Sequence, residues 1–146
     1  MGAIVEPLLF LPMAQTGRMA SDEAAVLTVG QVMIARPKTQ PGDALVADVR
    51  RAFENPSVRT VLLADDGVFR GAIDRDQLPE DAPADSAASD YAHTRPVTAT
   101  PAMPVPEAIK LLDGQAEPRL IVLDEDGATL RGLLCFNRGS GEFCVR

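Results

Sequence analysis

The chain has 146 residues, 46% of them hydrophobic and 24% charged, as expected of a soluble globular protein with one compact domain or two small halves sharing a core. Its formal net charge of −7 and its lack of tryptophan argue against general binding to nucleic acid or to acidic membrane surfaces. Two cysteines, Cys135 and Cys144, are too few for a disulfide framework. We expect two free thiols in a reducing cytosol, and hence a cytoplasmic protein, with a disulfide between them as the alternative.

Residues 1–27 carry no clear hydrophobic period, although Asp22–Leu27 suggests a short helix. The apolar run Leu8–Leu11 lies between Pro7 and Pro12. No lysine or arginine precedes this run, and it is far shorter than the about 20 residues that span a bilayer. We therefore predict an N-terminal arm that is either disordered or exchanged onto a partner chain.

A first set of short elements follows the arm. Thr28 is predicted to cap one or two helical turns over 29–33, which end before Pro37. A short extended segment over 38–40 contains Thr39, and a turn follows it.

A longer helix is predicted over Ala44–Glu54, capped by Asp43. Its buried face recurs at helical spacing and consists of Leu45, Val49, Ala52 and Phe53.

A hairpin pattern occurs twice, over 59–73 and 119–134. Each copy is an apolar run, an acidic turn closed by glycine, an Arg-Gly pair and a second apolar run. Asp/Gly turns between apolar runs are typical of β-hairpins, and the duplication indicates an internal repeat. One helical turn is predicted after the first hairpin, over Asp74–Leu78.

A Pro/Ala/Asp/Ser-rich linker over 80–88 separates the two copies, and the order of elements then repeats at an offset of 59 residues. Arg95-Pro96 matches Arg36-Pro37, and Thr98 matches Thr39.

The second longer helix is predicted to run to Asp113, with Gly114 as its C-terminal cap. Its buried face comprises Val105, Ala108, Ile109 and Leu112. The segment 138–141 breaks any further helix, and 142–146 is predicted to be extended.

The pattern defines two halves, 28–79 and 89–146, the second with an atypical C-terminal tail. We predict an α/β (α+β) fold of two pseudo-symmetric βαββα halves packed sheet to sheet, because a small three-stranded sheet cannot bury both its faces alone.

In motif order and spacing, the chain from Thr28 to about Arg138 resembles a tandem pair of CBS domains, the module named after cystathionine β-synthase. The resemblance rests on Val29–Met33, Pro37–Thr39 and the Asp-x-Gly hairpins, and in the second half on Arg95–Ala99 and Pro118–Val122. It implies a stand-alone regulatory module without catalytic activity. Such pairs form homodimeric discs of four domains and bind AMP, ADP, ATP or S-adenosylmethionine in clefts between their halves.

In the family's nucleotide signature, a hydroxyl and then an aspartate follow the second hairpin strand. Here the hydroxyl positions hold Asp74 and Cys135, and the ribose positions hold Gln77 and Arg138. A carboxylate repels phosphate, and arginine cannot accept a hydrogen bond from ribose. The signature is therefore altered in both halves.

Arginines offer an alternative anion site, with Arg59, Arg119 and Arg138 converging near Arg36 and Arg95. The competing interpretation is that they pair with surface acids or cap helices. If an anion binds, the second half is favoured, because the first half is acidic there. The candidate ligand-binding residues are Thr39, Arg59, Asp74, Gln77, Thr98, Arg119, Cys135 and Arg138.

Other chemistry finds little support in the sequence. His93 is the single histidine and has no cysteine pattern beside it, so no metal site is predicted. The acidic clusters match turn chemistry rather than Ca²⁺-loop spacing.

Three functional hypotheses follow: a sensor of an adenosyl, nucleotide-like or anionic molecule; a structural dimerisation module with empty clefts; and, more remotely, a thiol enzyme or redox switch using Cys135 and Cys144. The regulated partner is not indicated.

Overall fold

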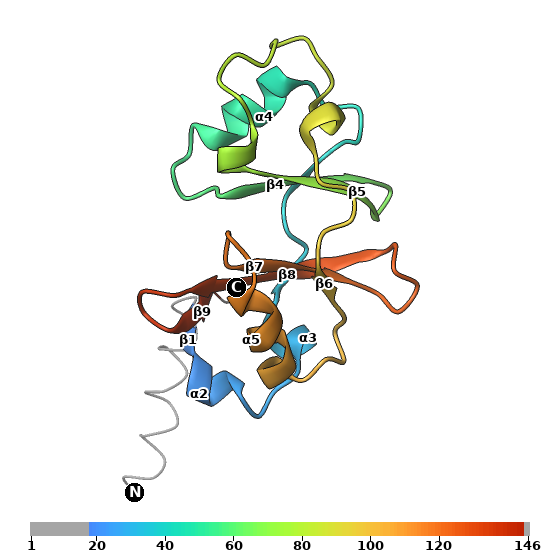
Figure 1. Cartoon of the computed structure of the whole chain (residues 1–146). Coiled ribbons are helices and arrows are strands. Elements are labelled where there is room, and N and C mark those ends of the chain that lie inside the picture. The colour runs from blue at the N-terminus through green and yellow to red at the C-terminus, as the bar shows by residue number, and fades with distance from the viewer. Residues whose placement is uncertain (1–17, 145–146) are drawn as a thin grey trace, which may run out of the picture. The chain divides into compact units, whose positions relative to one another are not determined.

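The structure is a computed structural model that describes residues 18–144 (Figure 1). The apolar run Leu8–Leu11 and most of the predicted N-terminal arm lie outside the described residues. Within residues 18–144, no helix has the length and apolar character needed to cross a membrane.

The chain divides into two compact units, and neither is a continuous stretch of sequence. Unit 1 comprises the residues up to Pro37, Thr98–Asp124 and the residues from Arg131 onward, whereas unit 2 comprises Lys38–Val97 and Glu125–Leu130. Each unit contains one of the predicted hairpins.

Unit 2 contains a three-stranded sheet with α4 on one face (Figure 1). Its elements are β3 (Thr39–Gln40), α4 (Val46–Phe53), β4 (Thr60–Asp65), β5 (Val68–Asp74) and two 3₁₀ turns, η1 (Arg75–Gln77) and η2 (Ala88–Tyr91). β3 runs parallel to β4, and β4 pairs antiparallel with β5, so the predicted first hairpin is confirmed.

The turn of this hairpin uses two residues with positive φ, Asp66 at 50° and Gly67 at 80°. This conformation suits the right-handed twist of the flanking strands, and Asp and Gly tolerate it best. Asp65 fixes the approach of the preceding loop, because its carboxylate accepts the N–H of Gly42 at 2.9 Å and lies 3.4 Å from Nε of Arg70.

Helix α4 begins two residues later than predicted. The N–H of Leu45 donates to the carboxylate of Asp48 at 3.0 Å, so the orphan donor at the helix start is satisfied from inside the helix and not by Asp43. Leu45 therefore lies outside the helix, and the prediction that it is buried is wrong, since it is 42% exposed. Val46 takes its place in the core together with Val49.

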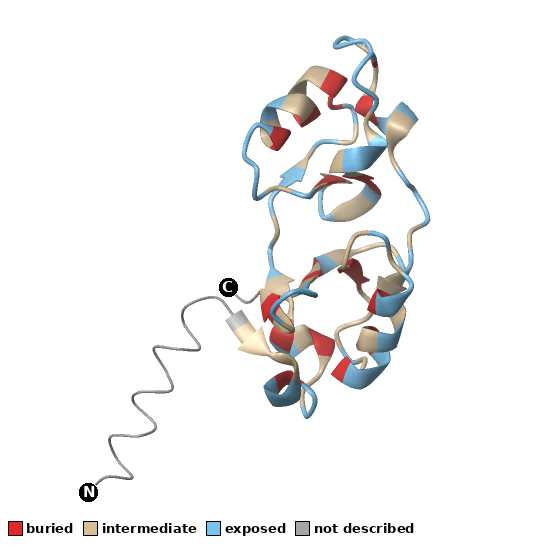
Figure 2. Cartoon of the chain, turned by 60° about the vertical axis from the view of Figure 1, so that its left-hand side comes forward, coloured by how far each residue is buried: buried red, intermediate tan, exposed pale blue. Residues whose placement is uncertain are grey.

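The core of unit 2 forms where α4 meets the sheet, and buried positions gather there in Figure 2. It consists of Ala44, Val49, Phe53, Val61, Leu63, Ile73 and Ala88.

Unit 1 contains the larger sheet, in the order β1-β9-β8-β7-β6, with β2 also paired to β8 (Figure 1). Its strands are β1 (Arg18–Ala20), β2 (Ile34–Ala35), β6 (Thr98–Ala99), β7 (Arg119–Leu123), β8 (Leu130–Asn137) and β9 (Glu142–Cys144). Its helices are α2 (Ser21–Ala24), α3 (Val29–Val32) and α5 (Val105–Asp113). The second hairpin and the helix ending at Asp113 are thus confirmed.

Strand β1 was not predicted. It pairs antiparallel with β9, placing Met19 opposite Phe143. Part of the region predicted as an arm therefore belongs to the sheet of unit 1, and 142–144 are extended as predicted.

The core of unit 1 is separate from that of unit 2 and is completed by β9. It consists of Ala24, Val29, Val32, Ala99, Val105, Ala108, Leu112, Leu120, Val122, Leu134 and Phe143. Phe143 is fully buried, with its ring centroid 4.9 Å from that of Phe136. Burying a phenylalanine side chain contributes about 1.5–3 kcal/mol, so this ring is a principal anchor of β9.

The two units are built by exchanging equivalent segments between the sequence repeats. Ile34 pairs with Leu133, and His93, 59 residues after Ile34, pairs with Ala72. In each case, a segment that opens one repeat joins the hairpin of the other repeat.

Two isolated bridges follow the same exchange. Thr28 pairs with Pro104, and Leu45 pairs with Ala87, with Thr28 and Ala87 lying 59 residues apart, as do Leu45 and Pro104. The mixed α/β class is confirmed. The sheet-to-sheet packing and the boundaries 28–79 and 89–146 stay predictions.

Candidate functional site

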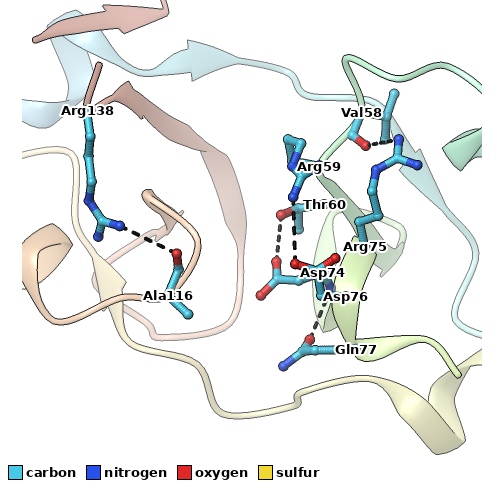
Figure 3. Close-up of polar contacts among 9 residues, drawn as sticks. All are labelled: Val58, Arg59, Thr60, Asp74, Arg75, Asp76, Gln77, Ala116 and Arg138. Atoms are coloured by element: carbon cyan, nitrogen blue, oxygen red, sulfur yellow. Dashed lines mark hydrogen bonds and ion pairs between the residues drawn. The ribbon is translucent and has the colours of Figure 1, made fainter. Parts of the chain in front are cut away.

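A polar cluster lies where the first hairpin runs into η1 (Figure 3). The hydroxyl of Thr60 donates to Oδ1 of Asp74 at 2.6 Å, and the two residues are register partners on β4 and β5. The N–H of Asp74 donates to Oε1 of Gln77 at 3.0 Å. The turn therefore brings the predicted hydroxyl and ribose positions of the first half together.

Gln77 is exposed and uses its amide oxygen in this turn. Figure 3 shows its side-chain nitrogen directed away from Asp74. The cluster thus presents a carboxylate acceptor from Asp74 beside an amide donor from Gln77, a pair suited to hydroxyl groups.

Arg59 brings positive charge to the same end of the hairpin. Its guanidinium lies 3.8 Å from Oδ2 of Asp76, with the side chains 48% and 84% exposed. Exposed pairs of this kind contribute about 0–1 kcal/mol, so little energy opposes a change of partner by Arg59.

The neighbouring Arg75 was not singled out from the sequence. Its guanidinium donates to the carbonyls of Asn55 at 2.9 Å and Val58 at 2.6 Å, and its Cζ lies 4.9 Å from the ring centroid of Phe53. Its Nε is buried and, among the described residues, has no hydrogen-bond partner. Arg75 therefore ties η1 to the chain that follows α4.

In unit 1 the equivalent tie comes from Arg138. Its guanidinium donates to the carbonyls of Leu112 at 2.9 Å, Ala116 at 3.5 Å and Gln115 (Figure 3). These carbonyls lie at the C-terminal end of α5, where a cation is favoured by the helix dipole. Any ligand anion has to share Arg138 with them.

Arg119 differs from Arg59, its counterpart in the repeat. It opens β7, and only 6% of it is exposed. The structure therefore gives the two predicted arginines different environments.

The two predicted threonines occupy equivalent places in the two sheets. Thr39 pairs in parallel with Leu62, and Thr98 pairs in parallel with Ile121. Each lies on the short strand next to the first strand of a hairpin, with Thr39 in unit 2 and Thr98 in unit 1.

The expectation of two free thiols is wrong, because Cys135 and Cys144 form a disulfide with a Cα–Cα distance of 5.3 Å. The tight return over 138–141 makes the two cysteines register partners on β8 and β9. The sequence pattern had not predicted that β9 pairs with β8. The argument from free thiols to a reducing cytosol loses its basis, and the cytoplasmic location stays a prediction.

Among residues 18–144, no group of three or more His, Cys, Asp or Glu side chains is placed to hold a metal ion. The acidic turn of the second hairpin instead organises itself. Asp126 accepts the hydroxyl of Thr129 at 2.6 Å and the N–H groups of Thr129 and Ala128, both at 2.9 Å. These bonds, that of the Thr129 hydroxyl foremost, lower the pKa of Asp126 from 3.8 to about 2.

Comparison with protein families gives one match: the family model of the CBS domain matches residues 88–136. None of the curated proteins matches the sequence.

Many solved structures share the fold. CBSX2, a CBS-pair protein from Arabidopsis thaliana, is 21% identical with a TM-score of 0.67, covering 80% of this chain and 92% of that chain. A putative acetoin utilization protein (AcuB) from Vibrio cholerae is 18% identical with a TM-score of 0.65, covering 74% and 83%. A structure of CBSX2 in complex with AMP is 22% identical with a TM-score of 0.64, covering 79% and 92%.

The duplicated hairpin, the helix that precedes it and the paired short strands are thus those of a CBS domain pair. Residues 88–136 belong to the CBS domain family, and the chain as a whole has the fold of a CBS domain pair.

Proposed function

We propose that the chain is a regulatory CBS domain pair, without catalytic activity, that binds an adenosine nucleotide at the polar end of its first hairpin. The observation that carries the proposal is the fold shared with CBSX2, which is described in complex with AMP. The ligand would shift the chain between two states by binding one of them more tightly.

In unit 2, Asp74 and Gln77 would bind the ribose hydroxyls. The carboxylate of Asp74 has acceptor capacity beyond its bond from Thr60, since a carboxylate offers about four lone-pair sites. The outward amide nitrogen of Gln77 supplies a donor. Arg59, weakly held by Asp76, would turn to the phosphate.

The charges of this site favour a small phosphate load. Asp74 and Asp76 stand beside the proposed phosphate partner, and the whole chain carries −7. We therefore expect AMP to bind more tightly than ATP, because each added phosphate charge meets more repulsion.

A thermal-shift series with AMP, ADP, ATP, S-adenosylmethionine and NAD tests the proposal. A ligand at about 100 times its Kd stabilises the folded protein by about 2.7 kcal/mol, which is readily measured. No shift with any of these compounds at millimolar concentration would contradict nucleotide sensing.

Two variants test the residues. Gln77→Glu keeps an oxygen for the N–H of Asp74 but removes the donor, and Arg59→Ala removes the charge. Each is expected to weaken AMP binding roughly tenfold. Arg131→Ala is the matched control, since Arg131 is also an exposed arginine, 3.3 Å from Asp124.

The alternative is a structural dimerisation module whose clefts hold no ligand. Specific observations in the second half favour it: Cys135 is engaged in a disulfide, and Arg138 is hydrogen-bonded to the end of α5. It predicts a stable homodimer, measured by light scattering, whose mass and melting temperature do not respond to any nucleotide.

A further inference from the structure

Cys144 occupies a central place in the sheet of unit 1. On one side it is the register partner of Cys135 on β8, to which it is joined by the disulfide. On the other side it is the register partner of Arg18 on β1. The disulfide therefore links β8 to the strand on which β1 is paired.

The attachment of β1 depends on β9 staying in place. Among the described residues, β1 pairs with β9 and with no other strand, over three positions. The chain after β1 makes one more bond to the same return, from the N–H of Ser21 to the carbonyl of Gly141 at 3.1 Å. A three-residue pairing has little stability of its own.

Strand β9 is itself short, and few contacts hold it. Phe143 is buried against Phe136, and Gly141 donates to the carbonyl of Asn137 at 2.8 Å. The remaining constraint is the disulfide, which closes a loop of few residues between Cys135 and Cys144.

The disulfide is open to chemistry from outside the core. Both cysteines are only partly buried, and the return between their strands includes exposed residues, 138–140. Access of this kind is what thiol–disulfide exchange requires.

We propose that the Cys135–Cys144 disulfide is a reducible latch that controls whether β1 stays docked on unit 1. The reductant is a dithiol. One of its thiolates attacks a sulfur of the pair and forms a mixed disulfide, which its second thiolate resolves. The dithiol becomes a disulfide, and the two electrons and two protons it loses leave Cys135 and Cys144 as thiols.

The test is limited trypsin digestion of the full chain before and after reduction with dithiothreitol, followed by mass spectrometry. The reporter is the peptide bond after Arg18, within β1. Two bonds serve as references, the one after Arg51 in α4 and the one after Arg119 in β7. Cleavage of a locally opened strand follows the population of its open form.

Reduction is expected to raise the cleavage rate after Arg18 roughly tenfold and to leave the reference bonds within about twofold. Reoxidation should restore protection. The double variant Cys135→Ser with Cys144→Ser is expected to be cleaved rapidly after Arg18 with or without reductant. Hydrogen exchange at 19–20 and 142–144 in the wild-type chain gives the same reading without a variant.

Three results would overturn the proposal. One is unchanged protection after Arg18 when both thiols have been titrated as free. Another is equal loss of protection at all three bonds, which means that reduction destabilises the whole chain rather than one strand. The third is a purified chain with two free thiols and a protected β1. None of these results depends on nucleotide binding, so the latch and the proposed function are tested separately.

Discussion

Arginine side chains close the ends of the two longer helices, and they come from different positions of the repeat. Arg75 follows β5 at once and bonds to carbonyls beyond α4, whereas Arg138 follows β8 and bonds to the end of α5. Arg138 stands at the position equivalent to Gln77, not to Arg75. The same structural need, a cation near the C-terminal carbonyls of a helix, is thus met from two places.

Arg138→Ala is expected to lower the free energy of unfolding by about 1–2 kcal/mol, because hydrogen bonds from a charged donor to carbonyls are lost at the end of a helix. Urea unfolding followed by circular dichroism measures the change. Arg131→Ala, which removes an exposed pair with Asp124, should cost no more than about 0.5 kcal/mol. Equal effects of the two substitutions would mean that the carbonyl contacts contribute nothing.

Asp126 makes stability depend on pH at the acidic end. Its pKa is lowered to about 2 in the folded chain, so its contribution to stability is complete above the ordinary value of 3.8 and is lost as the pH falls toward 2. Thr129→Val removes the largest cause and should raise the pKa of Asp126, measured by carboxyl-carbon NMR titration. The stability difference between wild type and Thr129→Val should then shrink between about pH 4 and pH 2. A titration curve unchanged by the substitution would remove the Thr129 hydroxyl as the cause.

At the scale of elements, the close approach of β2 to β8 requires glycine at position 132. A Cβ there would lie 2.7 Å from the carbonyl oxygen of Ile34 and 2.6 Å from Sδ of Met33. The methionine can turn away, but the carbonyl belongs to the strand itself. Gly71 meets a similar neighbour in unit 2, since its Cβ would lie 2.9 Å from that of Ala92.

Gly132→Ala is therefore expected to destabilise the protein by about 1–3 kcal/mol, because β2 has to move away from β8. Gly114→Ala is the matched control. Gly114 ends α5 with φ of −87°, and its Cβ would meet only the Leu111 carbonyl at 3.7 Å, so the change should be neutral or stabilising by up to about 1 kcal/mol. Thermal unfolding of both variants makes the comparison. A Gly132→Ala protein as stable as Gly114→Ala would show that β2 is free to shift.

The elements that the sequence predicted are those with a local signal. The hairpins carry Asp/Gly turns, and α5 carries a helical period ended by Gly114. Strands β1 and β9 have three residues each, too few for a period, and their pairing joins segments far apart in the chain. The disulfide was missed for the same reason, since it depends on the register of β9 against β8.

The candidate site was predicted as a set of positions but not as a set of contacts. Equivalence in the repeat placed Asp74 and Gln77 beside each other correctly. It gave no indication that Arg138 would bond to α5 or that Arg75 would matter, because a side chain's partner depends on which carbonyls the fold leaves unpaired.

For the molecule as a whole, the exchange of segments means that neither repeat contains a complete unit. Unit 1 takes its α3 and β2 from the first repeat and its α5, β7 and β8 from the second. Unit 2 likewise contains η2, from the start of the second repeat. The chain is therefore a pair of repeats in sequence and a different pair of units in space.

Fragments cut in the linker test this arrangement. Residues 1–79 and 88–146, expressed separately, are each expected to give poorly dispersed amide spectra, because each lacks segments that complete its core. Mixing them should restore the dispersion of the intact chain. A fragment 88–146 whose amide shifts alone match those of the intact protein would contradict the prediction.

The exchange also sets an order of events during synthesis. Residues 18–37 leave the ribosome first, yet their partners in unit 1 are Thr98–Asp124 and the chain from Arg131 onward. Pairing between segments so distant in sequence is slow, since the closure of a long loop precedes any gain from contact. The earliest part of the chain to emerge is therefore among the last to find its place. Until then its apolar side chains, Val29 and Val32 among them, are available to chaperones.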